Sequence, residues 1–126
     1  MRDVNVLIVD DNEMTRALLR SILSAEGYIV VGEASNGKNG LEQAMRLKPD
    51  VLCLDIMMPD GCGVDLLKEI KKELPKTVVM MVSAQRDADT VKECLAHGAT
   101  GFILKPFNAG IVTRTVKEAV MRAAMH

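Results

Sequence analysis

The sequence has no tryptophan, one tyrosine and two phenylalanines among its 126 residues. It contains no apolar run near the roughly 20 residues that span a bilayer, and its first residues, MRDVNV, lack the apolar segment of a signal peptide. Its 16 basic and 17 acidic side chains nearly cancel, so no overall field attracts nucleic acid or anionic lipid. We therefore expect no membrane and no direct nucleic-acid partner, and charged groups that act locally.

The cysteines are few and do not form a recognisable pair. Cys53, Cys62 and Cys94 are odd in number and have no CxxC spacing, which favours reduced thiols and a cytoplasmic location. With a mass of 13.7 kDa and 48% hydrophobic residues, the chain is long enough for one core and too short for two. Residues 1–126 are therefore expected to form a single domain.

Five short apolar runs have the length and the β-branched content of strands. They are VNVLIV at 4–9, YIVVGEA at 28–34, DVLCLD at 50–55, TVVMMVS at 77–83 and GFILK at 101–105. Their hydrophobicity is continuous, whereas a strand with one solvated face alternates. This pattern predicts strands that are covered on both faces.

The segments between these runs repeat apolar residues at intervals of three and four, as amphipathic helices do. Such residues are Met14, Leu18, Ile22 and Ala25; Leu41, Ala44 and Met45; Val64, Leu67 and Ile70; Val91, Cys94 and Leu95; Val112, Val116, Ala119, Val120 and Ala123. Gly27 and Gly98 stand where helices end, Pro49 and Pro75 stop helices, and Asn108 is placed to cap the last one. The order is strand then helix, five times.

Strict alternation of strands and helices predicts an α/β fold with a parallel five-stranded sheet between two layers of helices. In open sheets of this kind, ligands bind beyond the carboxyl ends of the strands, where the strand order reverses. The functional residues are therefore expected at the ends of the apolar runs.

Four of the five runs end in a polar or charged residue. The residues are Asp10 and Asp11, Asp55, Ser83 and Lys105. Each also has an ordinary interpretation: either aspartate of the first pair as a helix N-cap, Asp55 as a turn former, Ser83 as a cap of the next helix, and Lys105 as a solvated strand end. Independent capping does not explain why three carboxylates, a hydroxyl and an ammonium gather at one end of one sheet.

Three converging carboxylates repel one another unless a cation lies between them. Hard oxygen ligands in a partly built, water-open site suit Mg²⁺ better than Zn²⁺ or Ca²⁺. A carboxylate is also a nucleophile that can form an aspartyl phosphate. Asp55 is the best candidate, because it ends what should be the central strand; Mg²⁺, Lys105 and Ser83 would neutralise the phosphoryl oxygens.

The motifs LIVDDNE, LDIMMPDGCG, VVMMVSA and GFILKPF resemble the receiver domain of two-component response regulators, the CheY-like family. The resemblance covers essentially the whole chain and implies the flavodoxin-like strand order 2-1-3-4-5. It implies that Asp55 accepts a phosphoryl group from a sensor histidine kinase or a histidine phosphotransfer protein. It further implies Mg²⁺, for which Mn²⁺ can substitute, bound by Asp11, Asp55 and the Met57 main-chain carbonyl, with Asp10 acting through water.

The resemblance also assigns roles to residues around the acceptor. Lys105 and Ser83 would contact the phosphoryl oxygens, and the bond between Lys105 and Pro106 would be cis. Signal output would move Ser83 toward the phosphoryl group while Phe102 turns inward; a role of Phe102 as core filler is an equally good interpretation. Gln85, two residues after Ser83, occupies a place that helps or hinders an attacking water, so the phosphoryl lifetime is not predicted.

For output, the resemblance implies a surface made by the fourth helix, the fifth strand and the fifth helix, with Lys92, Phe102 and Lys117 exposed to a protein target. The alternative is that these lysines are merely solvated. A monomer or a weak phosphorylation-dependent dimer is expected. The chain ends at His126 directly after the fifth helix, so it either acts alone or is one module of a longer regulator.

Two other classes of function fit the residues less well. Phosphatases with an aspartate nucleophile need a second acid two residues further on, and that position is Met57. A nucleotide- or flavin-binding module needs a Gly-rich loop after the first strand or aromatic rings for stacking, whereas this chain has DDNEM and no tryptophan. We therefore expect a phosphoacceptor and not an enzyme that turns over substrates.

Overall fold

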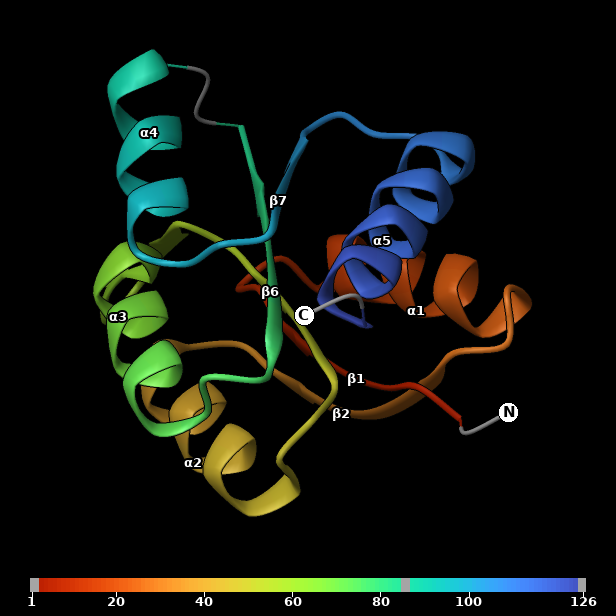
Figure 1. The fold of residues 1–126 in the computed structure, drawn as a ribbon, viewed down its shortest axis with the longest axis horizontal. Coiled ribbons are helices and arrows are strands. Elements are labelled where there is room, and N and C mark those ends of the chain that lie inside the picture. Colours follow the sequence, from red (N-terminus) through yellow and green to blue (C-terminus); the bar gives the residue numbers. More distant parts are fainter. Residues whose placement is uncertain (1–2, 85–86, 125–126) are drawn as a thin grey trace.

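The structure, a computed structural model, describes residues 3–84 and 87–124. Strands and helices follow one another along the chain and form three layers (Figure 1). The elements are β1 Asn5–Val9, α1 Glu13–Ala25, β2 Ile29–Ala34, α2 Gly37–Leu47, β3 Val51–Leu54, β4 Met57–Met58, β5 Gly61–Cys62, α3 Gly63–Glu73, β6 Val78–Ser83, α4 Ala88–Ala96, β7 Gly101–Leu104 and α5 Ala109–Ala124.

The main sheet has the strand order β2-β1-β3-β6-β7, and every neighbouring pair is parallel. Helices α1 and α5 lie on one face of this sheet, and α2, α3 and α4 lie on the other (Figure 1). With β6 and β7 as fourth and fifth strands, this is the predicted α/β fold and the predicted order 2-1-3-4-5. The strand order reverses at β1, and β3 is the central strand.

The short pair β4–β5 was not predicted. It is an antiparallel hairpin in which Met57 pairs with Cys62 and Met58 with Gly61. Two-residue strands are too short for any periodicity to indicate them. The hairpin lies between β3 and α3, so it directly follows the central strand.

Each helical layer has its own core, because successive residues of a strand point to opposite faces. In β1, Val6 and Ile8 pack in the core under α1 and α5, whereas Leu7 and Val9 pack under α2, α3 and α4. All four are fully buried, and each such burial contributes about 1.5–3 kcal/mol. The continuous apolar run seen in the sequence therefore corresponds to a strand covered on both faces.

The helix N-termini exclude the capping interpretation of the strand-end residues. Asn12 caps α1 by accepting a hydrogen bond from the Thr15 backbone N–H, and Asp87 caps α4 in the same way through Thr90. Asp10, Asp11 and Ser83 are therefore not N-caps of the helices that follow them. Capping of the following helices is therefore not what places these three residues at the sheet edge.

The predicted helix ends are confirmed. Gly27 and Gly98 follow α1 and α4 with φ of 88° and 99°, a left-handed conformation that glycine adopts without a steric penalty. Asn108 accepts a hydrogen bond from the Ile111 N–H at 2.9 Å, as an N-cap of α5. Helices α2 and α3 end before Pro49 and Pro75.

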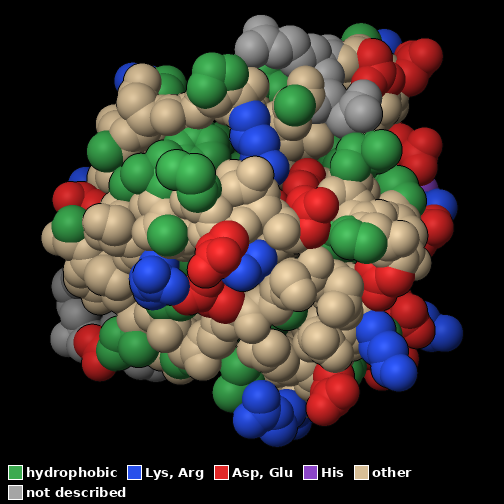
Figure 2. All heavy atoms as spheres, turned by 180° about the vertical axis from the view of Figure 1, so that it is seen from behind, with side chains coloured by type: hydrophobic (Ala, Val, Ile, Leu, Met, Phe, Trp, Pro, Cys, Tyr) green, Lys and Arg blue, Asp and Glu red, His purple; other side chains and the backbone are tan. Residues whose placement is uncertain are grey.

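The surface carries charges of both signs. Acidic and basic side chains are interspersed on the face shown in Figure 2, and hydrophobic side chains gather in its upper left part. This agrees with the near balance of charge in the sequence. No helix in the described part of the chain is both long enough and apolar enough to cross a membrane.

Candidate functional site

Three carboxylates meet at the carboxyl end of the sheet. Strands β1 and β3 are neighbours with Val9 opposite Leu54, so the residues that follow them, Asp10 and Asp55, emerge side by side. Asp10 and Asp55 are buried, with 1% and 5% exposure, and Asp11 is exposed. One oxygen from each carboxylate lies within 4.8 Å of the others. The structure thus brings together the acidic residues that the sequence placed at separate strand ends.

A cation from the fifth strand of the sheet joins this cluster. The Lys105 Nζ lies 2.9 Å from Asp10 Oδ2 and 3.4 Å from Asp55 Oδ2. The peptide bond between Lys105 and Pro106 is cis, and the Lys105 N–H donates to the Ser83 carbonyl at 2.9 Å. Lys105 is therefore part of the acidic site and not a solvated strand end.

The electrostatics of the site make Asp55 unusually basic. Burial and the Asp10 charge together raise the pKa of Asp55 to about 6, because the opposing effects of Lys105 and of the Met57 N–H are smaller. Burial by itself lowers the pKa of Lys105, but its contacts with Asp10 and Asp55 outweigh burial and raise that pKa above its usual value. At neutral pH the site therefore holds an ammonium and a carboxylate that is mostly ionised.

Asp10 is held from several directions. Its Oδ1 accepts a hydrogen bond from the Asn12 N–H at 2.8 Å, and its main-chain carbonyl accepts one from Arg16 Nη1 at 2.6 Å. Arg16 also forms an ion pair with Glu33 at 3.4 Å. Arg16 was not predicted as a site residue, because an arginine in the first turns of an amphipathic helix gives no signal of what it contacts. The hydrogen bonds from Asn12 and Arg16 fix the peptide unit between Asp10 and Asp11.

The turn after Asp55 depends on close backbone contacts. The Gly63 N–H donates to the Ile56 carbonyl at 2.6 Å, and a Cβ added at Gly63 would lie 2.1 Å from the Asp55 carbonyl oxygen. Only glycine permits this approach. The Met57 N–H points to Asp55 Oδ1 at 3.4 Å, and the Met57 side chain is exposed. Gly63 was missed by sequence reasoning, although a glycine at a helix start after a turn is a usable signal.

The remaining predicted residues have different outcomes. Ser83 ends β6 in a buried position, on the strand next to the one that carries Asp55. Phe102 lies on β7, partly buried, and packs against the core under α2, α3 and α4. Gln85 lies outside the described residues. The Met57 carbonyl as a metal ligand and the switch role of Phe102 stay predictions.

The donor set fits a hard divalent cation. Three carboxylates face one another with one ammonium nearby, so the cluster retains negative charge, and all of its ligand atoms are oxygens. Mg²⁺ prefers such ligands and accepts one or two carboxylates with the rest supplied by water or phosphate. Among the described residues this is the one group of His, Cys, Asp or Glu side chains able to hold a metal ion.

The parallel sheet thus brings Asp10, Asp11, Asp55 and the cis-linked Lys105 together at one of its edges. The sequence pattern of the response regulator receiver domain matches residues 6–117. The chain belongs to the response regulator receiver domain family, the receiver family of two-component signalling.

The relatives include proteins of two lengths. The chain is 40% identical to the chemotaxis protein CheY of Thermotoga maritima over 113 residues, which are 90% of this chain and 94% of that protein. It is 36% identical to the response regulator protein VraR of Staphylococcus saprophyticus over 116 residues, 91% of this chain and 56% of that protein. The chain thus spans nearly all of the first and about half of the second.

Solved structures give the same fold. A CheX–CheY complex from Borrelia burgdorferi with BeF3 and Mg²⁺ contains a chain that is 33% identical, with a TM-score of 0.89 over 91% of this chain and 87% of that chain. A CheY-like receiver domain protein from Methanospirillum hungatei is 27% identical, with a TM-score of 0.92 over 98% of both chains.

Proposed function

We propose that Asp55 accepts a phosphoryl group from a sensor histidine kinase or a histidine phosphotransfer protein, with Mg²⁺ required, and that phosphorylation changes binding to a downstream protein. Residues 1–126 act as one receiver domain, either alone or as a module of a longer regulator. The observation that carries this proposal is the convergence of Asp10, Asp11 and Asp55 with Lys105 at one edge of the sheet.

The ionisation of Asp55 suits a nucleophile. With its pKa raised to about 6 in the metal-free protein, Asp55 is still mostly ionised at pH 7, and the ionised carboxylate is the form that acts as a nucleophile. A carboxylate oxygen forms the new bond to phosphorus as the bond from phosphorus to the histidine nitrogen breaks. The electron pair of the broken bond remains on the imidazole nitrogen.

The residues around Asp55 have complementary tasks in this step. Asp11, Asp55 and the Met57 carbonyl would hold Mg²⁺ or Mn²⁺, with Asp10 acting through water; the bound ion supplies charge neutralisation for a phosphoryl oxygen. The Lys105 ammonium, already 3.4 Å from Asp55 Oδ2, would neutralise a second oxygen. Lys105 thereby exchanges contacts with carboxylates for contacts with the phosphoryl group.

Output follows from the position of Ser83 beside Asp55. The Ser83 hydroxyl would bind the third phosphoryl oxygen, and the Ser83 carbonyl already accepts the Lys105 N–H at 2.9 Å. Phe102 lies two residues before Leu104, which pairs with Ser83 in the sheet. Movement of Ser83 would thus reach Phe102 and the surface of α4, β7 and α5, where Lys92 and Lys117 would meet a protein target.

The relative from Borrelia burgdorferi supports this chemistry, because its complex contains both BeF3 and Mg²⁺. A BeF3 group attached to an oxygen is tetrahedral and has the shape of a phosphoryl group. That complex also contains CheX, a protein partner, so a receiver of similar sequence forms a complex with another protein in that state.

The deciding experiment mixes the protein with a small acyl phosphate and Mg²⁺ and follows its mass. The wild type should gain one phosphoryl group that hydroxylamine removes, since acyl phosphates are labile, and a chelator should prevent the gain. Asp55→Ala should gain none. Asp65→Ala is the matched control, because Asp65 is an exposed acid on α3 whose ion partner is Lys68 at 4.0 Å. Labelling of Asp55→Ala, or an adduct stable to hydroxylamine, would refute the proposal.

A further inference from the structure

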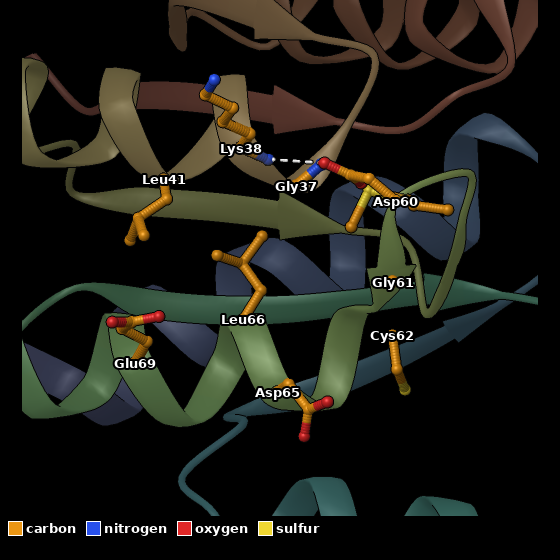
Figure 3. A pocket seen from close by; sticks show the side chains of 10 residues that line it. Gly37, Lys38, Leu41, Asp60, Gly61, Cys62, Asp65, Leu66 and Glu69 are labelled. Carbon is orange, nitrogen blue, oxygen red and sulfur yellow. Dashed lines mark hydrogen bonds between the residues drawn. The ribbon is translucent and has the colours of Figure 1, made fainter.

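The hairpin that follows Asp55 is tied at its turn to a helix far away in sequence. Asp60 lies between β4 and β5, and its carboxylate accepts two backbone hydrogen bonds from the first turn of α2. The Gly37 N–H donates to Oδ1 at 2.8 Å and the Lys38 N–H to Oδ2 at 3.0 Å, across 23 and 22 residues of sequence. Figure 3 shows Asp60 directed at this helix end.

Helix α2 requires this carboxylate for two reasons. Its own cap, Asn36, satisfies the Asn39 N–H and leaves the N–H groups of Gly37 and Lys38 for another acceptor. Its first turn has no acidic residue, so the negative charge that favours a helix N-terminus comes from Asp60. The same two hydrogen bonds lower the pKa of Asp60, which keeps it ionised.

The hairpin is therefore held at both of its ends. Its base is closed by the 2.6 Å hydrogen bond from the Gly63 N–H to the Ile56 carbonyl, next to Asp55. Its turn is held by Asp60 on α2. Met57 lies between these two anchors and pairs with Cys62 across the hairpin. These two anchors restrain the main chain at Met57.

We propose that Asp60 is a positioning residue of the metal site: by binding the N-terminus of α2 it fixes the hairpin and thus the Met57 main chain. This inference rests on the proposed function, in which the Met57 carbonyl is a metal ligand. Asp60 itself belongs neither to the three-carboxylate cluster nor to the set of groups near Lys105. It acts through the backbone, by keeping a ligand in place before the ion arrives.

The competing explanation of these hydrogen bonds is that Asp60 only caps α2 and has no effect on the metal site. The chain offers a matched control for this explanation. Asn36 and Asp60 both cap α2, but only Asp60 is part of the hairpin. Asn36→Ala and Asp60→Ala should weaken the helix end to a similar extent. A difference between them in metal binding then reports the link from α2 to the hairpin.

The test is calorimetric titration of the full chain with Mg²⁺ for the wild type, Asp60→Ala, Asp60→Asn and Asn36→Ala. Mutation of residues that orient a metal ligand typically costs about 10- to 100-fold in affinity, and because Asp60 acts only through the hairpin backbone, the Mg²⁺ Kd should rise by about tenfold, the lower end of that range, in Asp60→Ala. Asp60→Asn keeps one acceptor oxygen and should be intermediate. Asn36→Ala should stay close to the wild type.

A second readout separates positioning from damage to the acceptor. Rates of phosphorylation by a small acyl phosphate, measured against Mg²⁺ concentration, should show a raised half-saturation in Asp60→Ala and a nearly unchanged maximal rate. Equal Kd values in Asp60→Ala and the wild type, or equal weakening by Asn36→Ala, would overturn the role of Asp60. A wild type that neither binds Mg²⁺ nor takes a phosphoryl group would instead refute the proposed function, and the role of Asp60 with it.

Discussion

The two ends of the central sheet differ in what their charged side chains contact. At the amino end, the Asp50 carboxylate accepts a hydrogen bond from the Asn5 N–H at 2.9 Å, and the Thr77 hydroxyl donates to the Pro49 carbonyl at 2.9 Å. Lys71 donates to the carbonyls of Pro75 and Thr77 at 2.9 and 2.8 Å. Charged and polar side chains at this end are matched to backbone groups.

At the carboxyl end, charged side chains face one another instead. Asp10, Asp11 and Asp55 converge, and Lys105 is the cation they share. Burial and the neighbouring Asp10 raise the pKa of Asp55 to about 6, so its ionisation opposes folding. Polar groups at the amino end stabilise the fold, whereas the carboxylates at the carboxyl end repel one another, and a bound cation would relieve this repulsion. This difference is the reason for proposing the functional site at the carboxyl end.

The largest expected effect is on the rate of phosphorylation, which should depend on Lys105 at the carboxyl end and not on Lys71 at the amino end. Lys105→Ala removes the cation beside Asp10 and Asp55 and should slow phosphorylation by an acyl phosphate at saturating Mg²⁺ about 100-fold or more. Lys71→Ala removes two hydrogen bonds at the opposite end; it should lower the free energy of unfolding by roughly 1–3 kcal/mol and leave the rate unchanged. Phosphorylation rates and urea unfolding measure the two effects. A similar loss of rate in both variants would mean that the ends are not functionally distinct.

A smaller effect separates Asp55 at the carboxyl end of the sheet from Asp50 at its amino end. In metal-free buffer at pH 7, Asp55→Asn should raise the free energy of unfolding by roughly 1–2 kcal/mol, since a shift of about two pKa units is worth at most about 3 kcal/mol and solvent in the open crevice reduces it. Asp50→Asn weakens a charge-assisted hydrogen bond and should lower that free energy by about 1 kcal/mol or less.

The stability gained by Asp55→Asn over the wild type should depend on pH, and the raised pKa of Asp55 fixes the direction of this dependence. The folded-state pKa of Asp55 lies above the value of 3.8 expected in the unfolded chain, so the folded form binds the proton more tightly. The Asp55 contribution should therefore reduce stability as the pH rises from about 4 to about 6, so the stability of Asp55→Asn relative to the wild type should increase over this range. Urea unfolding at pH 4.5 and at pH 7 measures it. An advantage of the variant that is equal at both pH values would contradict the raised pKa.

The last expected effect concerns stability at the amino end and leaves the rate of phosphorylation unchanged. Thr77→Val replaces the hydroxyl by a methyl group of similar size and leaves the Pro49 carbonyl without its donor, which should lower the free energy of unfolding by about 1–2 kcal/mol. Phosphorylation should proceed at the wild-type rate. Thermal unfolding measures the change in stability, and the mass assay measures the rate of phosphorylation. A slowed reaction in this variant would show that the amino end of the sheet also affects phosphorylation, against the proposed difference between the two ends.

Much of this fold was predictable from the pattern of apolar residues. Residues 6–9 and 51–54, directly before Asp10 and Asp55, are all apolar, because their strands are covered on both faces. The capping alternatives were not resolvable locally: an aspartate before a helix has the same chemistry whether it caps or not. The structure decides the matter, because Asn12 and Asp87 are the caps.

Other parts of the site had no local signal. The contact of Asp60 with Gly37 and Lys38 joins residues 22 and 23 positions apart, and the β4–β5 strands are two residues long. The hydrogen bond from Arg16 to the Asp10 carbonyl depends on how α1 packs against β1. Such contacts are set by packing between elements, which periodicity along the chain does not encode.

The order of strands and helices and the identity of the residues at each strand end were determined by the sequence, because hydrophobic periodicity and helix-ending residues act locally. Which of those residues meet, and with what pKa, was decided only by the tertiary structure. The interaction between Asp10, Asp55 and Lys105 depends on separations of a few ångströms and on burial. Both quantities arise only once β1, β3 and β7 are assembled in one sheet.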